Sequence, residues 1–96
     1  MVLPVRLTVE ARTDRARLAA FLAELSPHAA ERAMNLIEVA LRRLSAYPET
    51  GRPSMDGRRD LPIRFGASGY IVQYRVDPDA VVIARIFHMR EDRSDA

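Results

Sequence analysis

The chain has 96 residues, of which 48% are hydrophobic and 29% are charged, and its formal net charge is +2. A chain of this length builds one two-layer core, so we expect a single domain over residues 1–96. The absence of cysteine excludes disulfide bonds and cysteine-ligated metal sites. No stretch approaches the roughly 20 apolar residues of a membrane span, and no secretory signal is visible, so we expect a cytoplasmic protein.

Arginine supplies all 15 basic residues, and lysine is absent. This excludes any mechanism that needs a lysine. A guanidinium group is flat and permanently charged, so it suits surfaces that bind carboxylates, phosphates or aromatic faces. Genomic base composition would produce the same bias without a binding role. A net charge of only +2 gives little support to nucleic-acid binding, and we expect no direct sequence-specific contact with nucleic acid.

The first half of the chain predicts one strand and two helices. Apolar and polar residues alternate over 3–9, the pattern of a strand with one buried face. Apolar residues at helical spacing predict a helix over 12–25, with Asp14 in its charged first turn. The Ser-Pro pair at 26–27 predicts the N-cap and first position of a second helix, which ends at the Tyr-Pro pair 47–48. Helices joined this tightly form an antiparallel hairpin.

The second half predicts a loop and then a meander of three strands. Residues 48–57 are rich in proline and glycine, which is typical of a loop. Alternation then predicts a strand over 60–65, and its Pro62 is tolerated only at an edge or a bulge. Short turns lead into two further strands, over 70–76 and 81–89.

Arg85 stands in the middle of the last strand, which is apolar on both faces. A guanidinium group in such a place must pair with a carboxylate or open onto a binding face. Within the chain, Asp60 or Glu38 would supply the carboxylate; otherwise Arg85 anchors an acidic partner segment. The second face of the strand is likewise either covered by the first strand and the C-terminal tail or left for a partner.

The sequence carries no recognisable catalytic motif. It lacks a nucleophile elbow, a P-loop, a dinucleotide fingerprint and a paired-carboxylate motif. His28 and His88 lie on different elements without a third ligand at a recognisable spacing, so we expect no metal site. His88 has two interpretations, as an acid or base and as a structural histidine held by a neighbour.

Several short motifs occur in a fixed order along the chain: Pro27-His28-Ala29-Ala30, Leu44-x-x-Tyr47-Pro48-x-x-Gly51-Arg52, Arg59-Asp60-Leu61, Gly69-Tyr70-x-Val72-x-Tyr74-Arg75-Val76 and Val82-x-Ala84-x-Ile86-x-His88-x-Arg90. Their order and spacing together resemble the ParE/RelE toxin superfamily over about residues 5–93. The resemblance implies an α+β fold of order β-α-α-β-β-β, with a helical hairpin packed on an antiparallel sheet.

The resemblance also implies a toxin neutralised by a ParD-like antitoxin, whose C-terminal segment wraps the toxin surface in a hetero-oligomer. ParE members poison DNA gyrase, whereas RelE members cut mRNA in the ribosomal A site. RNA cleavage without a metal needs basic groups that activate the 2′-OH and stabilise the phosphorane. RelE-type nucleases supply these groups from the two middle strands, where this chain has Pro62 and Ile71. Arg64 and Arg90 match the pattern, and no tyrosine follows Arg93.

We therefore expect a non-enzymatic toxin of the ParE type, without catalytic residues, metal or cofactor. Contacts with the target or antitoxin are expected from Arg58, Arg59, Arg64, Arg75, Arg85, His88, Arg90 and Arg93. Two alternatives are open: a RelE-type ribonuclease that uses arginine alone, and a non-toxic module that binds an antitoxin.

Overall fold

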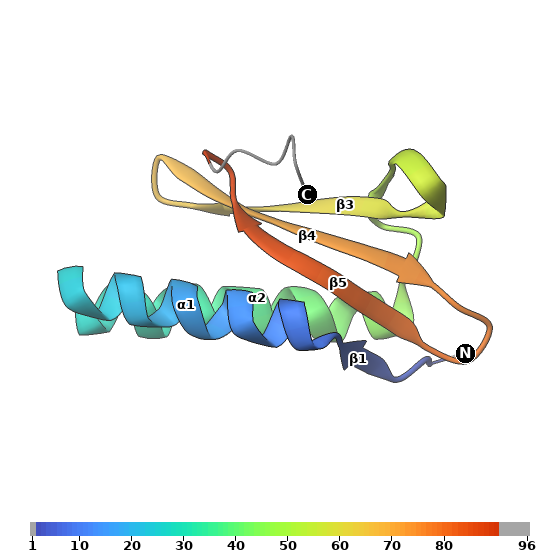
Figure 1. Cartoon of the computed structure of the whole chain (residues 1–96), viewed down its shortest axis with the longest axis horizontal. Helices are drawn as coiled ribbons and strands as arrows, with labels where there is room; N and C mark the ends of the chain where they lie inside the picture. Colours follow the sequence, from blue (N-terminus) through green and yellow to red (C-terminus); the bar gives the residue numbers. More distant parts are fainter. Residues whose placement is uncertain (1, 91–96) are drawn as a thin grey trace.

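The computed structural model describes residues 2–90, in which two helices lie against one face of a sheet (Figure 1). Within this range no helix has the length and apolar character needed to cross a membrane. The elements follow in the order β1 (Val5–Leu7), α1 (Val9–Leu25), α2 (Pro27–Ala46), β2 (Arg52–Pro53), a 3-10 turn (Met55–Gly57), β3 (Arg59–Phe65), β4 (Ser68–Val76) and β5 (Val81–His88).

A side-chain hydroxyl caps the N-terminus of each helix in the hairpin. Ser26 ends α1 by donating its N–H to the carbonyl of Leu22, and its hydroxyl accepts the N–H of Ala29 at the start of α2. The predicted hairpin is therefore confirmed. However, α1 begins at Val9 rather than at residue 12, because the Thr8 hydroxyl accepts the N–H of Ala11 and satisfies one of the open donors of the first turn.

The sheet has the order β1-β5-β4-β3-β2. Strands β3 to β5 form the predicted antiparallel meander, and β2 extends it in antiparallel pairing with β3. However, β1 runs parallel to β5, so the sheet is mixed. The N–H of Val81 donates to the carbonyl of Pro4, and the N–H of Thr8 donates to the carbonyl of Ile83. These bonds hold the first and last strands of the described chain together at one side of the sheet.

The segment predicted as a loop over 48–57 contains the two-residue strand β2 and the 3-10 turn. Strand β2 pairs only with Arg59 and Asp60 of β3. In the pairing of residues 2–90, the remainder of β3 therefore has no strand on that side, which confirms the edge position predicted for Pro62.

A bulge in β5 places Ile83 and Ile86 on the same face of the sheet. Gln73 pairs with Arg85, whereas the next residue of β4 pairs with Ile83, so Ala84 is an extra residue. As a result Ile83 and Ile86 both lie opposite core residues of β4, and both are fully buried. Arg85 is thereby turned away from this core.

Candidate functional site

A cleft of about 680 Å³ opens between the second half of α1 and the end of the sheet at which β4 begins and β5 ends. We call it the α1 cleft, and it is lined by Arg17, Leu18, Phe21, Leu22, Tyr70, His88 and Arg90. Its volume lies within the range of about 300–1,000 Å³ typical of ligand sites. Its walls combine an apolar helix face with aromatic and cationic groups.

The sheet wall of the α1 cleft is aromatic. The ring of Tyr70 lies 6.1 Å from that of Phe65 and meets the ring of His88 edge-on at 5.6 Å, measured between centroids. Burial raises the pKa of Tyr70, so its hydroxyl stays protonated at neutral pH. Tyr70 can therefore donate a hydrogen bond in the cleft but is a poor base.

His88 is oriented by the backbone that follows it. Its Nδ1 accepts a hydrogen bond of 3.2 Å from the N–H of Arg90. In the neutral imidazole this contact places the proton on Nε2, which makes Nε2 a donor. The same contact holds the exposed Arg90 next to the cleft.

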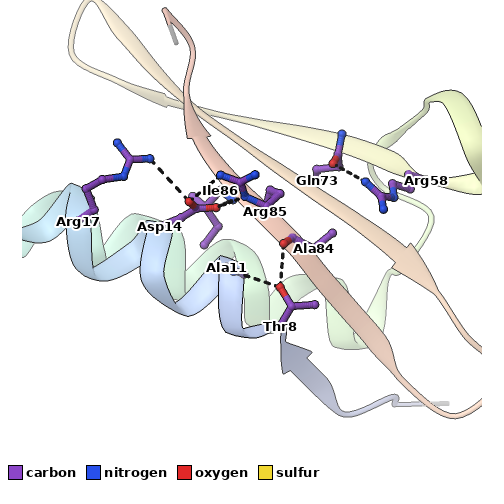
Figure 2. Close-up of polar contacts among 9 residues, drawn as sticks. All are labelled: Thr8, Ala11, Asp14, Arg17, Arg58, Gln73, Ala84, Arg85 and Ile86. Atoms are coloured by element: carbon purple, nitrogen blue, oxygen red, sulfur yellow. Dashed lines mark hydrogen bonds and ion pairs between the residues drawn. The ribbon is translucent and has the colours of Figure 1, made fainter. Parts of the chain in front are cut away.

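Asp14 links α1 to β5 beside the cleft (Figure 2). Its carboxylate accepts two hydrogen bonds from Arg85, of 2.7 and 3.0 Å, and one of 2.9 Å from the N–H of Ile86. Arg17 lies 3.7 Å from the same carboxylate. Burial by itself raises the pKa of Asp14, but the hydrogen bonds and the two arginine charges outweigh it and lower that pKa. Asp14 is therefore ionised at neutral pH.

Of the two alternatives for Arg85, the structure shows the pairing with a carboxylate of its own chain, but neither Asp60 nor Glu38 is that carboxylate. Asp14 takes that place, because α1 runs along the part of β5 that β1 does not cover. Glu38 lies 3.7 Å from Arg15 instead. Asp60 lies opposite Gln73 on the neighbouring pair of strands.

The other predicted site residues are spread over the molecule. Arg58 donates to Gln73, Arg75 to Asp77, and Arg59 to the carbonyls of Glu49 and Gly51. Arg64 lines a separate groove between α2 and β3. His88 and Arg90 meet in the α1 cleft, and Arg93 lies outside the described residues.

The helix side of the α1 cleft was not predicted from the sequence. The helical spacing of Leu18, Phe21, Leu22 and Leu25 predicted a helix and no binding site, yet Phe21 is 59% exposed and Leu25 is 71% exposed. The available signal was Arg17 directly beside this apolar stripe. Among residues 2–90, no group of histidine and acidic side chains is arranged to hold a metal ion.

The chain resembles known toxins over nearly its whole length. Residues 5–93 match the family described as ParE toxin of the type II toxin-antitoxin system, parDE. Toxin RelE3 of Caulobacter vibrioides is 45% identical over 93% of this chain and 97% of its own length. Toxin RelE1 of the same organism is 38% identical over 97% of this chain and 100% of its own length.

Two solved structures share the fold. One belongs to the chromosomal ParDE toxin-antitoxin system of Pseudomonas aeruginosa, with a TM-score of 0.79 and 24% identity over 93% of this chain and 98% of that one. The other is from the toxin-antitoxin complex RelBE2 of Mycobacterium tuberculosis, with a TM-score of 0.62 and 29% identity over 92% of this chain and 99% of that one.

Proposed function

The chain belongs to the ParE toxins of type II toxin-antitoxin systems, and from this premise we propose that it poisons DNA gyrase by protein contact. In this proposal the single domain of residues 1–96 acts in the cytoplasm and stabilises the cleavage complex of gyrase with DNA. It breaks no bond itself. A ParD-like antitoxin neutralises it in a hetero-oligomer. Structural neighbours from ParDE and RelBE toxin-antitoxin systems support a protein antitoxin.

The observation that carries the proposal is that two arginines of the sheet, Arg75 and Arg85, are bound to carboxylates of the same chain. Arg85 of β5 binds Asp14, and Arg75 of β4 binds Asp77. Metal-free RNA cleavage needs cationic groups that converge on the phosphate and stabilise its developing charge. An arginine already bound to a carboxylate is less available for that role. We propose that the exposed predicted arginines and His88 make contacts with target or antitoxin rather than perform chemistry.

A second candidate, a RelE-type ribosome-dependent ribonuclease, is favoured by two observations. Both curated relatives are named RelE toxins. The α1 cleft also brings an imidazole, a protonated phenol and two guanidinium groups to one place. In this alternative His88 transfers the proton, and Arg17 and Arg90 stabilise the phosphorane.

One pair of assays separates these candidates. The toxin is co-expressed with its antitoxin, purified away from it, and added in excess to gyrase supercoiling reactions and to ribosomes that carry a defined mRNA. Loss of supercoiling with intact mRNA supports the gyrase proposal. Cleaved mRNA with normal supercoiling, and loss of that cleavage in His88→Ala, identifies the ribonuclease. A folded protein that affects neither assay and does not arrest growth is the non-toxic binding module.

A further inference from the structure

We propose that the groove between α2 and β3 holds the target protein by binding an acidic amphipathic helix of that target. This inference rests on the proposed function, in which the target is DNA gyrase. We call the groove the α2 groove, and its volume is about 310 Å³. Its walls include Leu36, Val39 and Arg43 of α2 and Leu61, Pro62 and Arg64 of β3. Among the described residues, none that lines the α2 groove also lines the α1 cleft.

The helix wall of the α2 groove is a second apolar stripe on α2, beside the stripe that packs into the core. Leu36 and Val39 are 42% and 44% exposed. Together with Arg43 they follow the i, i+3, i+7 spacing by which one helix packs against another. Large apolar side chains that are exposed at this spacing, on the wall of a groove, match a helix-in-groove site.

The sheet wall is open because β2 pairs only with the first two residues of β3. Beyond that pairing, Leu61 is half-buried, Pro62 is exposed and Ile63 is buried at the base of the groove. A partner in the groove would therefore contact apolar side chains from both α2 and β3.

The charges of the α2 groove select an acidic partner. Its lining residues include no aspartate or glutamate, and its two charged side chains are the exposed Arg43 and Arg64. Within residues 2–90 neither of these guanidinium groups is paired with a carboxylate, unlike those of Arg75 and Arg85. Guanidinium groups bind carboxylates through paired N–H donors, so a cation on each wall complements a helix with acidic flanks.

The edge of β3 favours a helix over an added strand. The N–H of Ser54 donates to the carbonyl of Arg58, which therefore faces the open side of β3. Backbone groups alternate between the two sides of a strand, so Pro62 and Arg64 also present theirs on that side. Because Pro62 has no N–H, a strand added here would lose a hydrogen bond in the middle of its ladder.

The groove also suits a protein better than the DNA of the cleavage complex. Single-stranded nucleic acid binds by stacking its bases on aromatic side chains, and none of the described residues that line the groove is aromatic. Two arginines would also neutralise few phosphates of a duplex.

The test measures inhibition of gyrase supercoiling by purified toxin and matched variants. Val39→Glu removes an apolar contact and adds a carboxylate that repels an acidic helix, so the half-inhibitory toxin concentration should rise on the order of tenfold or more. Val9→Glu makes the same change on α1, at a residue that is 73% exposed and outside the groove, and should leave that concentration unchanged.

A second pair of variants tests the charge. Arg43→Glu should also raise the half-inhibitory concentration and should make inhibition less sensitive to added salt. Arg12→Glu, at an exposed arginine of α1 outside the groove, is its control and should inhibit as wild type does. Melting temperatures within about 2 °C of wild type exclude misfolding as the cause of a loss. If Val39→Glu does not fold, the exposed Arg43 carries the test.

The outcomes separate this inference from the proposed function. If wild type inhibits gyrase and the folded groove variants inhibit it equally well, the inference is wrong and the proposed function stands. A loss of antitoxin affinity at least as large as the loss of inhibition would also overturn the inference, because the groove would then belong to the antitoxin. A wild-type toxin that leaves supercoiling unchanged would remove both.

Discussion

The guanidinium of Arg85 donates two hydrogen bonds to the carboxylate of Asp14, across 71 residues of sequence. Asp14 is 3% exposed, whereas the Arg85 side chain is 33% exposed. The two partners are therefore unequal: without Asp14 the guanidinium can still turn to water, but without Arg85 the carboxylate keeps a buried charge. The same carboxylate also accepts the N–H of Ile86, which lies in the part of β5 that does not pair with β1.

Arg85→Ala should destabilise the protein more than Asp14→Asn does. Removal of Arg85 leaves a buried carboxylate with fewer donors, for which we expect a loss of about 2–4 kcal/mol in the free energy of unfolding. In Asp14→Asn the amide oxygen would still accept the Ile86 N–H, so a loss of about 1–2 kcal/mol is expected there. Urea titrations of both variants measure the difference. Equal losses, or a larger loss in Asp14→Asn, would contradict the proposed asymmetry.

Asp14 should also make the protein sensitive to acid. Its folded pKa lies below its unfolded value, because hydrogen bonds and arginine charges outweigh the effect of burial. The stabilisation is thus fully present above the unfolded pKa, about 3.9, and is lost as pH falls through the folded pKa. We expect wild type to lose more stability than Asp14→Asn when the pH is lowered from about 5 toward 2. If the free energy of unfolding falls equally with pH in the two proteins, Asp14 does not contribute to the acid sensitivity.

The local features of this fold were predictable from the sequence, and the reason is visible in the helical hairpin. Ser26 and Pro27 specify the junction through contacts with residues no more than four positions away. Likewise, the buried residues of α2 recur at helical spacing, and this spacing alone determines which residues share a face: they are Ala30, Ala33, Ile37, Leu41 and Leu44.

Long-range pairings could not be read in the same way. The parallel contact of β1 with β5 and the choice of Asp14 over Asp60 both depend on how distant segments meet. In the sequence, Asp14 fits the first turn of a helix equally well as a favourable charge for the dipole. The bulge at Ala84, which sets the direction of Arg85, has no distinct sequence signal because the strand around it is apolar on both faces.

The hydroxyl of Tyr74 holds the segment between α2 and β2. It donates to the carbonyl of Pro48 at 2.7 Å and accepts the N–H of Gly51 at 2.8 Å. Tyr74→Phe leaves two partly or fully buried polar groups without this partner, so a loss of about 1–3 kcal/mol is expected. Tyr47→Phe, at a side chain that is 68% exposed, is the matched control and should be neutral. Thermal unfolding compares the two variants.

Faster amide exchange at Gly51 in Tyr74→Phe would show that the loss is local to this segment. If the Gly51 amide remains as protected as in wild type, the hydroxyl is not what holds the segment.

Gly51 should tolerate no side chain. A Cβ at this position would lie 2.7 Å from the Tyr74 hydroxyl oxygen and 3.0 Å from the carbonyl oxygen of Asp60. Gly51→Ala should therefore cost about 1–3 kcal/mol, by overpacking a buried site. Without the clash, the same change would stabilise the protein by reducing the entropy of the unfolded chain. Chemical denaturation measures whether the substitution lowers or raises the free energy of unfolding. A stabilised Gly51→Ala would show that the Tyr74 side chain moves aside easily.

Thr8 joins the start of α1 to the sheet, so its loss should cost more than the loss of an ordinary N-cap. Its hydroxyl accepts the N–H of Ala11 and donates to the carbonyl of Ala84 at 2.8 Å (Figure 2). Ser26 caps α2 in the same way but makes no sheet contact that the structure records within residues 2–90. Ser26→Ala should cost about 1 kcal/mol, as is typical for a cap. Thr8→Val keeps the shape and loses both bonds, for which we expect about 2 kcal/mol. Urea unfolding of the two variants tests the difference, and equal costs would mean that the bond to Ala84 adds nothing to the cap.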